Sequence, residues 1–473
     1  MKTNATAGTL LLVLALGVSG CSQQRRVPDL RGLYDRAAQA HGPDRNPIIA
    51  IPGILGSKLH DGSSDRVVWG AFGGGAADPG KPDGARLLAL PMGEGDRLAD
   101  LTDTVYPNGA LDRIKVRLFG LPIALKAYLN VMKTLGTGGY RDEDVTLADI
   151  DYGRDHFTCF QFSYDWRRDL SENARRLHEF ILEKRVYVED QYRKRYGIED
   201  PEVRFDIAAH SMGGLLTRYY LRYGGEPLPA DGSVPPPTWK GAENVERVVL
   251  VGTPNGGSLN ALEDLVKGRK LGPFLPRIEP AVIGTMPAVY QLLPRDRHGP
   301  LVDLTERDQR VGSVFDPDLW QRMGWGLADP EQAEVLEVLL PDVADPARRR
   351  QIALDHQKKS LLRARQFTRA MDQPSEPPAH LTLKLVAGDA VPTTSVLGVD
   401  RVRGELAIVD RAAGDGTVLR TSALLDERVG GQWRPRLASP IAWDDVDFLF
   451  RDHLGMTKDP QFADNVLFFL LEE

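Results

Sequence analysis

Residues 205–214 have the sequence FDIAAHSMGG, and this stretch decides the fold. A β-rich run, Val203–Ala208, enters it, and a helical pattern over Gly214–Arg222 leaves it. A serine between a strand and a helix, with small residues two positions before and after it, is typical of a nucleophile elbow, because larger side chains collide in so sharp a turn. Ser211 is therefore the predicted nucleophile, with Ala209 where the pattern has its first glycine. A serine that only caps the helix is the alternative.

Other short apolar runs predict strands of the same sheet. They are rich in β-branched or aromatic residues, end in Gly, Pro or Ser turns, and alternate with helical patterns such as Ser171–Tyr196. This alternation predicts an α/β fold around a mainly parallel sheet. The predicted strands lie in Pro47–Pro52, Phe157–Phe162, Val203–Ala208, Val245–Val251 and Leu381–Val386.

The strand signal stops between about Leu262 and Gln373, where the sequence is charged and helix-like, and it resumes at His380. We interpret this as a helical insertion in one sheet domain; an independent all-α domain is the alternative. The predicted core therefore comprises residues 47–261 and 380–473, and the insertion comprises residues 262–379. Residues 21–46 are polar and indicate a linker with at most one short helix.

Acyl transfer by a serine needs backbone N–H groups directed at the developing oxyanion. Met212, directly after the serine, is one predicted donor. The second should come from a loop after an early strand, and IIAIPGILG at 48–56 contains a Pro-Gly turn in that place. Leu55 is the predicted donor there, and Ile54 is the alternative.

The acid and then the histidine should follow the serine along the chain. Four histidines follow Ser211, but three of them lie in the insertion or open a strand, so that only His453 comes after every plausible acid turn. His453 is the predicted base. Two aspartates compete for the acid: Asp415, between glycines in AGDGTV (413–418), and Asp389, directly after a strand. Spacing favours Asp415 and leaves Asp389 open.

The composition excludes several classes of protein. Of the 473 residues, 42% are hydrophobic and 26% are charged, which is a globular balance and not that of a disordered chain. The net charge of −7 offers no basic footprint for nucleic acid. Two cysteines, Cys21 and Cys159, are too few for a disulfide framework or a Cys-based zinc site. We predict no metal and no organic cofactor.

The first 20 residues predict an export signal. Lys2 precedes a short apolar run, Leu10–Val18, and small residues lead to Cys21. This pattern resembles a bacterial lipobox, which implies cleavage before Cys21, lipidation of that cysteine and a lipid-anchored protein of the bacterial cell envelope. Because Ser22 is not acidic, the outer membrane is favoured over the inner one. An ordinary secretory signal is the alternative.

Together the motifs resemble those of the lecithin:cholesterol acyltransferase family, which includes phospholipid:diacylglycerol acyltransferases and lysosomal phospholipases. The likeness covers most of residues 47–473, and the pairing of YDWR at Tyr164–Arg167 with AHSMGG at 209–214 is its most specific mark. The other matching motifs are IPGILGSKL (51–59), VVW (67–69), GTPNGGS (252–258), MPAVYQLLP (286–294), GDGTV (414–418) and DHLG (452–455).

The resemblance implies an α/β-hydrolase fold with a helical cap and a lid loop at about 66–90. It selects Asp415 as the acid, with Ser211 as nucleophile and His453 as base, and it implies the same two oxyanion donors. Trp69 falls where the lid of the family lies. This sequence lacks the cysteine pair of that lid and is rich in glycine there, so a more mobile lid is expected.

The implied activity is the transfer of an acyl group from a phospholipid or another lipid ester, through an acyl-enzyme, to a lipid alcohol such as a sterol or glyceride. If water is the acceptor, the same residues make a lipase or phospholipase. The implied contact with a membrane runs through lipidated Cys21. Two other classes stay open: an inactive lipid-binding lipoprotein, and an exported peptidase, since the same triad cleaves amides.

Overall fold

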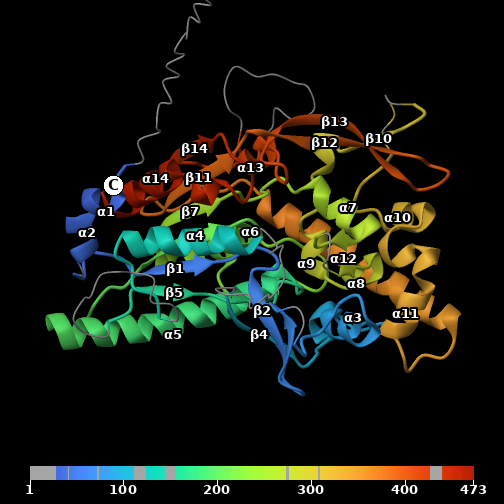
Figure 1. Cartoon of the computed structure of the whole chain (residues 1–473), viewed down its shortest axis with the longest axis horizontal. Coiled ribbons are helices and arrows are strands. Elements are labelled where there is room, and N and C mark those ends of the chain that lie inside the picture. Colours follow the sequence, from blue (N-terminus) through green and yellow to red (C-terminus); the bar gives the residue numbers. More distant parts are fainter. Residues whose placement is uncertain are drawn as a thin grey trace, which may run out of the picture.

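The computed structural model describes residues 28–40, 42–71, 74–110, 124–143, 156–272, 276–306, 309, 311–426 and 439–472. Helices surround a central sheet, and a helical segment drawn in yellow and orange lies at one end of it (Figure 1). No helix in these ranges is both long and apolar enough to cross a membrane. Cys21, the predicted lipidation site, lies outside the described residues.

Within the described residues, six strands form the central sheet in the order β14-β11-β7-β6-β1-β5, and every neighbouring pair is parallel. Its inner strands are buried almost throughout, because helices cover both faces. The predicted α/β fold with a mainly parallel sheet is confirmed. The strands are β1 (Ile48–Ile51), β5 (Cys159–Gln161), β6 (Phe205–His210), β7 (Val245–Val251), β11 (Thr382–Gly388) and β14 (Asp445–Leu449).

Alternate residues of β1 show how the two faces are covered. Ile49 and Ile51 pack in the larger core with α5 (Leu170–Tyr196) and α6 (Met212–Tyr223), whereas Ile48 and Ala50 pack with α4 (Ala124–Thr137) and α14 (Pro460–Leu471). These helices make a three-layer α/β arrangement, which holds the carboxyl ends of the strands along one edge.

Outside the central sheet, the described residues form one antiparallel sheet, one mixed sheet and one short hairpin. The first sheet joins β2 (Ser57–Asp61), β3 (Arg66–Trp69) and β4 (Val105–Ala110). The second pairs β12 (Val391–Val399) with β13 (Leu406–Gly414), and β10 (Leu301–Asp303) joins it parallel to β12. The hairpin consists of β8 (Arg269–Lys270) and β9 (Arg277–Ile278). The sequence did not predict these sheets.

The predicted insertion, 262–379, gives no strand to the central sheet in its described residues and is mostly helical. It nevertheless contains β8, β9 and β10, so a purely helical segment was too simple an expectation. The exact domain bounds stay predictions. The helices are α7 (Leu259–Lys267), α8 (Pro280–Gly284), α9 (Pro287–Tyr290), α10 (Pro317–Met323), α11 (Ala333–Leu339) and α12 (Pro346–Met371).

The described part of the predicted linker packs on the core. It contains α1 (Leu30–Leu33) and α2 (Asp35–Gln39), where one short helix at most was expected. Tyr34 lies between these two helices, is buried, and donates from its hydroxyl to Asp464 Oδ1 of α14 at 2.8 Å. Two further short α-helices of the described residues are α3 (Pro82–Leu88) and α13 (Arg420–Leu424).

Candidate active site

Ser211 lies at the turn between β6 and α6, with φ 53° and ψ −124°. A non-glycine residue at positive φ is strained and persists only when its surroundings hold it. Here the amide of Ser211 donates to Val251 O on β7 at 2.8 Å, which fixes the turn against the next strand. The predicted strand–serine–helix arrangement is thus the geometry of this segment.

Neighbouring atoms lie so close to the backbone around this turn that only glycine fits at several positions. A Cβ on Gly213 would lie 2.5 Å from Pro52 O, and one on Gly53 would lie 2.8 Å from the Cβ of Ser211. A Cβ on Gly214 would collide with the Thr253 side chain. The Pro-Gly turn after β1 is therefore pressed against the serine, where a second donor to an oxyanion belongs.

His453 joins the serine to a carboxylate. Its Nε2 lies 3.2 Å from Ser211 Oγ, and its Nδ1 lies 2.7 Å from Asp415 Oδ2. The backbone amide of His453 also donates to Asp415 O at 2.8 Å, which ties the two loops together. The structure therefore brings together the three side chains that the sequence singled out; their catalytic roles stay predictions.

The two candidate acids have different surroundings. Asp415 is buried, and its Oδ1 accepts from the amides of Thr417 at 2.9 Å and Val418 at 2.6 Å, which leaves Oδ2 for the histidine. Asp389 instead accepts from Arg420 Nη1 at 2.9 Å. The structure therefore distinguishes the two candidate acids, which the sequence spacing did not: Asp415 contacts His453, and Asp389 pairs with Arg420.

His210, next to the serine, is a site residue that the sequence analysis did not single out. Its ring centroid lies 5.1 Å from that of His453. Burial, with the charge of His453 second, lowers the pKa of His210 to about 3, so that this ring is neutral at pH 7. It packs beside the predicted base without adding a competing charge. Its only signal in the sequence was its place directly before the serine.

The predicted oxyanion donors lie on both sides of the serine. Met212 is the first residue of α6, and the first N–H groups of a helix have no partner within it. Leu55 has φ 65°, and its side chain is buried in the core. The alternative, Ile54, lines the cavity at the serine, whereas Leu55 does not. Leu55 and Ile54 both stay predicted donors, and the position of Ile54 in the cavity wall favours Ile54.

Trp69, predicted on the lid loop, is buried at the end of a strand. It ends β3, is only 4% exposed, and meets Trp166 edge-on with ring centroids 5.5 Å apart. Its Nε1 donates to Leu55 O at 2.9 Å. The indole therefore faces inward and holds the Pro-Gly turn, while its place on a lid stays a prediction.

The YDWR motif supports the same turn from the other side. Tyr164 donates from its hydroxyl to Pro52 O at 3.0 Å, and Trp166 Nε1 donates to Ser57 O at 3.2 Å. Asp165 and Arg167 form a fully buried ion pair at 2.8 Å. The positive charges beside Asp165 hold its pKa below the ordinary value against the effect of its burial. The motif therefore has a structural part in this fold.

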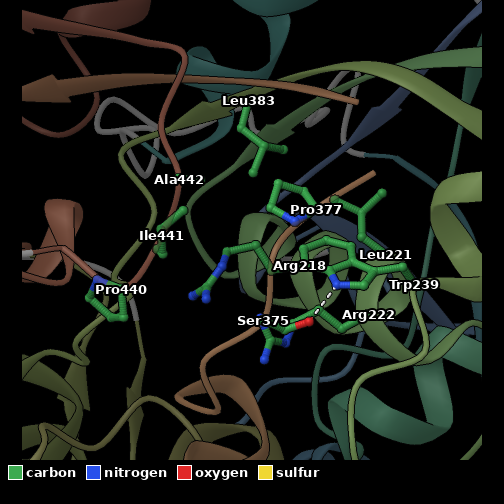
Figure 2. Close-up of a pocket in the computed structure, with 10 residues that line it drawn as sticks. All are labelled: Arg218, Leu221, Arg222, Trp239, Ser375, Pro377, Leu383, Pro440, Ile441 and Ala442. Carbon is green, nitrogen blue, oxygen red and sulfur yellow. Dashed lines mark hydrogen bonds between the residues drawn. The ribbon is translucent and has the colours of Figure 1, made fainter. Parts of the chain in front are cut away.

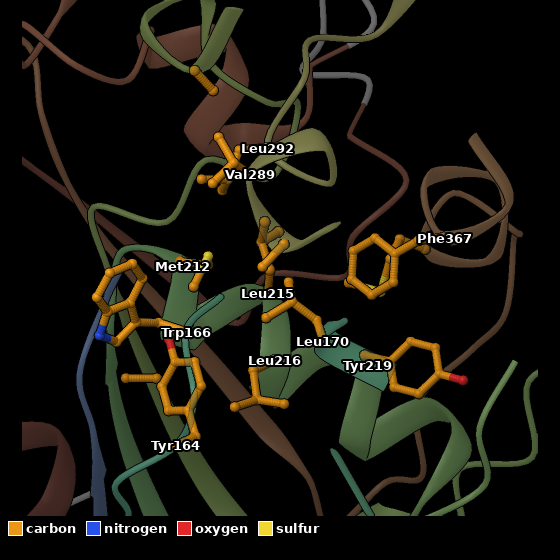
Figure 3. Packing of buried hydrophobic residues seen from close by; sticks show 14 of the residues in the cluster. Tyr164, Trp166, Leu170, Met212, Leu215, Leu216, Tyr219, Val289, Leu292 and Phe367 are labelled. Atoms are coloured by element: carbon orange, nitrogen blue, oxygen red, sulfur yellow. The ribbon is translucent and has the colours of Figure 1, made fainter. Parts of the chain in front are cut away.

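A cavity of about 870 Å³, including its open mouth, lies over the serine. Val289 and Leu292, which also belong to the apolar core near Met212, form part of its wall (Figure 3). Polar side chains form another part, including Asp264 and Arg269, which pair at 3.1 Å. The space therefore offers an apolar wall to an acyl chain and a polar one to a head group or acceptor.

In the described ranges, no group of three or more His, Cys, Asp or Glu side chains lies close enough together to hold a metal ion. The nucleophile, base and acid described above need no metal to act on an ester.

Comparison with known proteins shows which family part of the chain is similar to. The model of the family described as "Lecithin:cholesterol acyltransferase" matches residues 121–314. Residues 121–314 are therefore similar to the lecithin:cholesterol acyltransferase family. The resemblance drawn from the motifs is thereby confirmed. The matched segment contains Ser211, while Asp415 and His453 lie beyond it.

Among solved structures, the one titled "The crystal structure of Tle4-Tli4 complex" is similar in fold, with a TM-score of 0.52 and 14% sequence identity. The alignment covers 90% of this chain and 98% of that one. No curated protein matches the chain. The fold is that of an α/β-hydrolase, and the match of residues 121–314 to the lecithin:cholesterol acyltransferase model supports an enzyme that acts on lipid esters.

Proposed function

We propose that this protein is a serine-dependent O-acyltransferase that takes an acyl group from a lipid ester and passes it to a lipid alcohol, such as a sterol or glyceride. The observation that carries the proposal is the hydrogen-bonded line from Ser211 Oγ through His453 to Asp415 at the floor of a partly apolar cavity. That line is the arrangement by which a serine is activated for acyl transfer.

In the first half of the reaction, His453 Nε2 takes the proton of Ser211 as Oγ attacks the ester carbonyl. Asp415 accepts from Nδ1–H of His453, holds the ring in the required tautomer and stabilises its positive charge. The C–O bond of the ester then breaks, and the leaving alcohol receives the proton from His453. An acyl-enzyme on Ser211 remains.

The negative oxygen of each tetrahedral intermediate needs donors already in place. The amide of Met212, at the start of α6, and one amide of the Pro-Gly turn, from Leu55 or Ile54, would provide them. The turn is supported for this task by Trp69 and Tyr164, which bond Leu55 O and Pro52 O. Rigid support matters because a donor gains most when it does not have to reorganise.

In the second half, an acceptor hydroxyl gives its proton to His453 and attacks the acyl-enzyme, and Ser211 regains a proton as it leaves. A lipid alcohol makes the enzyme a transferase, and water makes it a lipase or phospholipase. Hydrolysis is the second candidate, because the cavity is open at its mouth and has polar walls, including Asn260 and Asp264, that water can reach.

The deciding experiment uses phospholipid labelled in its acyl chain, presented with cholesterol or diglyceride to the full chain in detergent. Ser211→Ala is the blank, and products are separated by chromatography. Label in a new sterol or glyceride ester supports the transferase. Label only in free fatty acid supports the hydrolase. Equal turnover by the blank would refute both and leave an inactive lipid-binding protein, and turnover of peptides alone would indicate a peptidase.

We also propose that the chain is lipid-anchored at Cys21 in the bacterial cell envelope, with the outer membrane favoured. Small residues before the cysteine and the short apolar run support this. A tether would keep the active site beside its substrates. Metabolic labelling with palmitate should mark the wild-type chain and not Cys21→Ala. Unlabelled wild-type protein would indicate an ordinary secretory signal.

A further inference from the structure

A second cavity lies beside α6 and shares no wall residue with the cavity at the serine. Arg218 and Arg222 form one side, and Trp239, Ser375 and the segment 440–442 form others (Figure 2). The space is about 340 Å³, including its open mouth. Nothing in the proposed reaction uses it.

The two arginines are in an unusual position for cations. Each has 5% of its surface exposed, and they are four residues apart on α6, so that they lie on the same helix face. Arg218 donates to Asn255 Oδ1 at 2.9 Å and to Met371 O at 3.2 Å. Each of these acceptors is uncharged.

Arg222 is bound in the same way. It donates from Nη2 to Gln373 O, while its buried Nε has no hydrogen-bond partner in the described residues. The indole of Trp239 lies 5.5 Å from its guanidinium carbon and is itself held by a 2.7 Å bond from Nε1 to Ser375 Oγ. The guanidinium of Arg222 is therefore held in place with a donor to spare.

The nearby carboxylate does not balance these charges. Asp372 is occupied by Arg295, with contacts of 2.9 and 3.0 Å, and by Arg297 at 2.5 Å. Burial, with the charge of Arg222 second, lowers the pKa of Arg218 to about 9, and the charge of Asp372 offsets this only in part. Buried cations are ordinarily paired, because an unpaired one is costly.

We propose that this cavity binds a phosphate dianion, either free or as the end group of a small phosphomonoester. Two guanidinium charges match a dianion, whereas a carboxylate would neutralise only one. Guanidinium N–H groups fit phosphate oxygens well in distance and direction. Arg218 and Arg222 both line the cavity, so their guanidinium groups are the donors available to such an anion.

The site is joined to the catalytic loops. Arg218 begins about 10 Å along α6 from Ser211, at 1.5 Å per residue. Its partner Asn255 donates from Nδ2 to Ala423 O at 2.7 Å, in the helix that follows the Asp415 loop. A bound anion would thus stabilise the contact between the nucleophile helix and the acid loop. Binding itself does not depend on the proposed function.

The test measures the melting temperature of the full chain in detergent with added inorganic phosphate, against sodium chloride of equal ionic strength. We expect saturating phosphate to raise Tm by about 2 °C or more beyond the chloride sample. Arg222→Gln should abolish this rise, and in buffer without phosphate it should melt no lower than wild type, because it removes one of two like charges. Arg365→Gln, at an exposed position on α12, is the matched control and should keep the rise.

Titration calorimetry with inorganic phosphate and with glycerol 3-phosphate separates the two sources of the ligand, since the tighter binder identifies the one that the site selects. A single site per chain, lost in Arg222→Gln, supports the proposal. No rise in Tm for wild type would overturn it, as would an equal rise in wild type and Arg222→Gln. If Arg222→Gln does not fold, phosphate is titrated into Arg222→Lys instead, which keeps the positive charge but lacks the planar guanidinium group. Undiminished affinity in Arg222→Lys would show that the guanidinium group of Arg222 does not hold the anion.

Discussion

Arg363, in the middle of α12, forms an ion pair with Asp169, the residue that caps the start of α5. Asp169 is 1% exposed and also accepts from Gln291 Nε2 at 2.8 Å. Arg363 donates as well to Ser171 Oγ at 3.0 Å. One guanidinium thus fastens the inserted helical segment to the core.

Arg363→Ala should therefore lower the free energy of unfolding by about 3 kcal/mol, because it leaves a buried carboxylate without its cation. Urea unfolding followed by circular dichroism measures this. Arg365→Ala, two positions on and exposed, should change it by less than about 0.5 kcal/mol. Equal effects of the two substitutions would show that the ion pair is not what joins the segment.

Asp415→Asn should reduce kcat for ester turnover by about 10⁴-fold, because the amide does not hold His453 in the tautomer that accepts the serine proton. Asp389→Asn should stay within a few-fold of wild type, since Asp389 pairs with Arg420 on the protein surface. Both variants are assayed with a soluble ester and checked for folding. The reverse order of effects would assign the acid to Asp389.

Trp69→Phe should lower kcat by about tenfold, a loss of about 1.4 kcal/mol in transition-state stabilisation, with little change in KM. The substitution keeps the aromatic packing on Trp166 but removes the bond to Leu55 O that holds the predicted oxyanion turn. Steady-state kinetics separates the two constants. A rise in KM alone would instead place Trp69 in substrate binding.

Asp206→Asn should stabilise the protein at pH 8. Asp206 is buried at the start of β6, and burial raises its pKa to about 7, above the unfolded value near 3.8. Its contribution to stability is therefore fully present below about pH 4 and is lost as pH rises through 7. The amide does not ionise, so the gain in Tm over wild type should be large at pH 8 and small at pH 4. Thermal melts across this range measure it.

The elbow and five strands of the central sheet were predictable, because their residues are apolar, β-branched and bounded by turns. The sixth, β14, was not, since DVDFL carries two aspartates. The structure explains them: Asp445 and Asp447 pair with Lys384, which lies buried on the neighbouring strand β11. The buried Lys384 thus requires carboxylates on the neighbouring strand. The residue pattern of β14 taken alone does not show this requirement.

Much of the candidate site was also predictable, because the chemistry of acyl transfer restricts residue type and order. Ser211, His453 and Asp415 follow from that order together with the family motif. The inward placement of Trp69 was not predictable, since the sequence does not show which face of a short antiparallel strand is covered. The neutral state of His210 and the closeness of two buried arginines on α6 also depend on burial, which the sequence alone does not show.

The separation of the site residues along the chain has a consequence for biogenesis. Ser211 and His453 are 242 positions apart. A nascent chain therefore contains the predicted nucleophile well before the predicted base has been synthesised. The contact between the two side chains forms only after the intervening residues, including the loop that carries Asp415, have been made and folded. Chain order thus delays assembly of the candidate site to a late stage of folding.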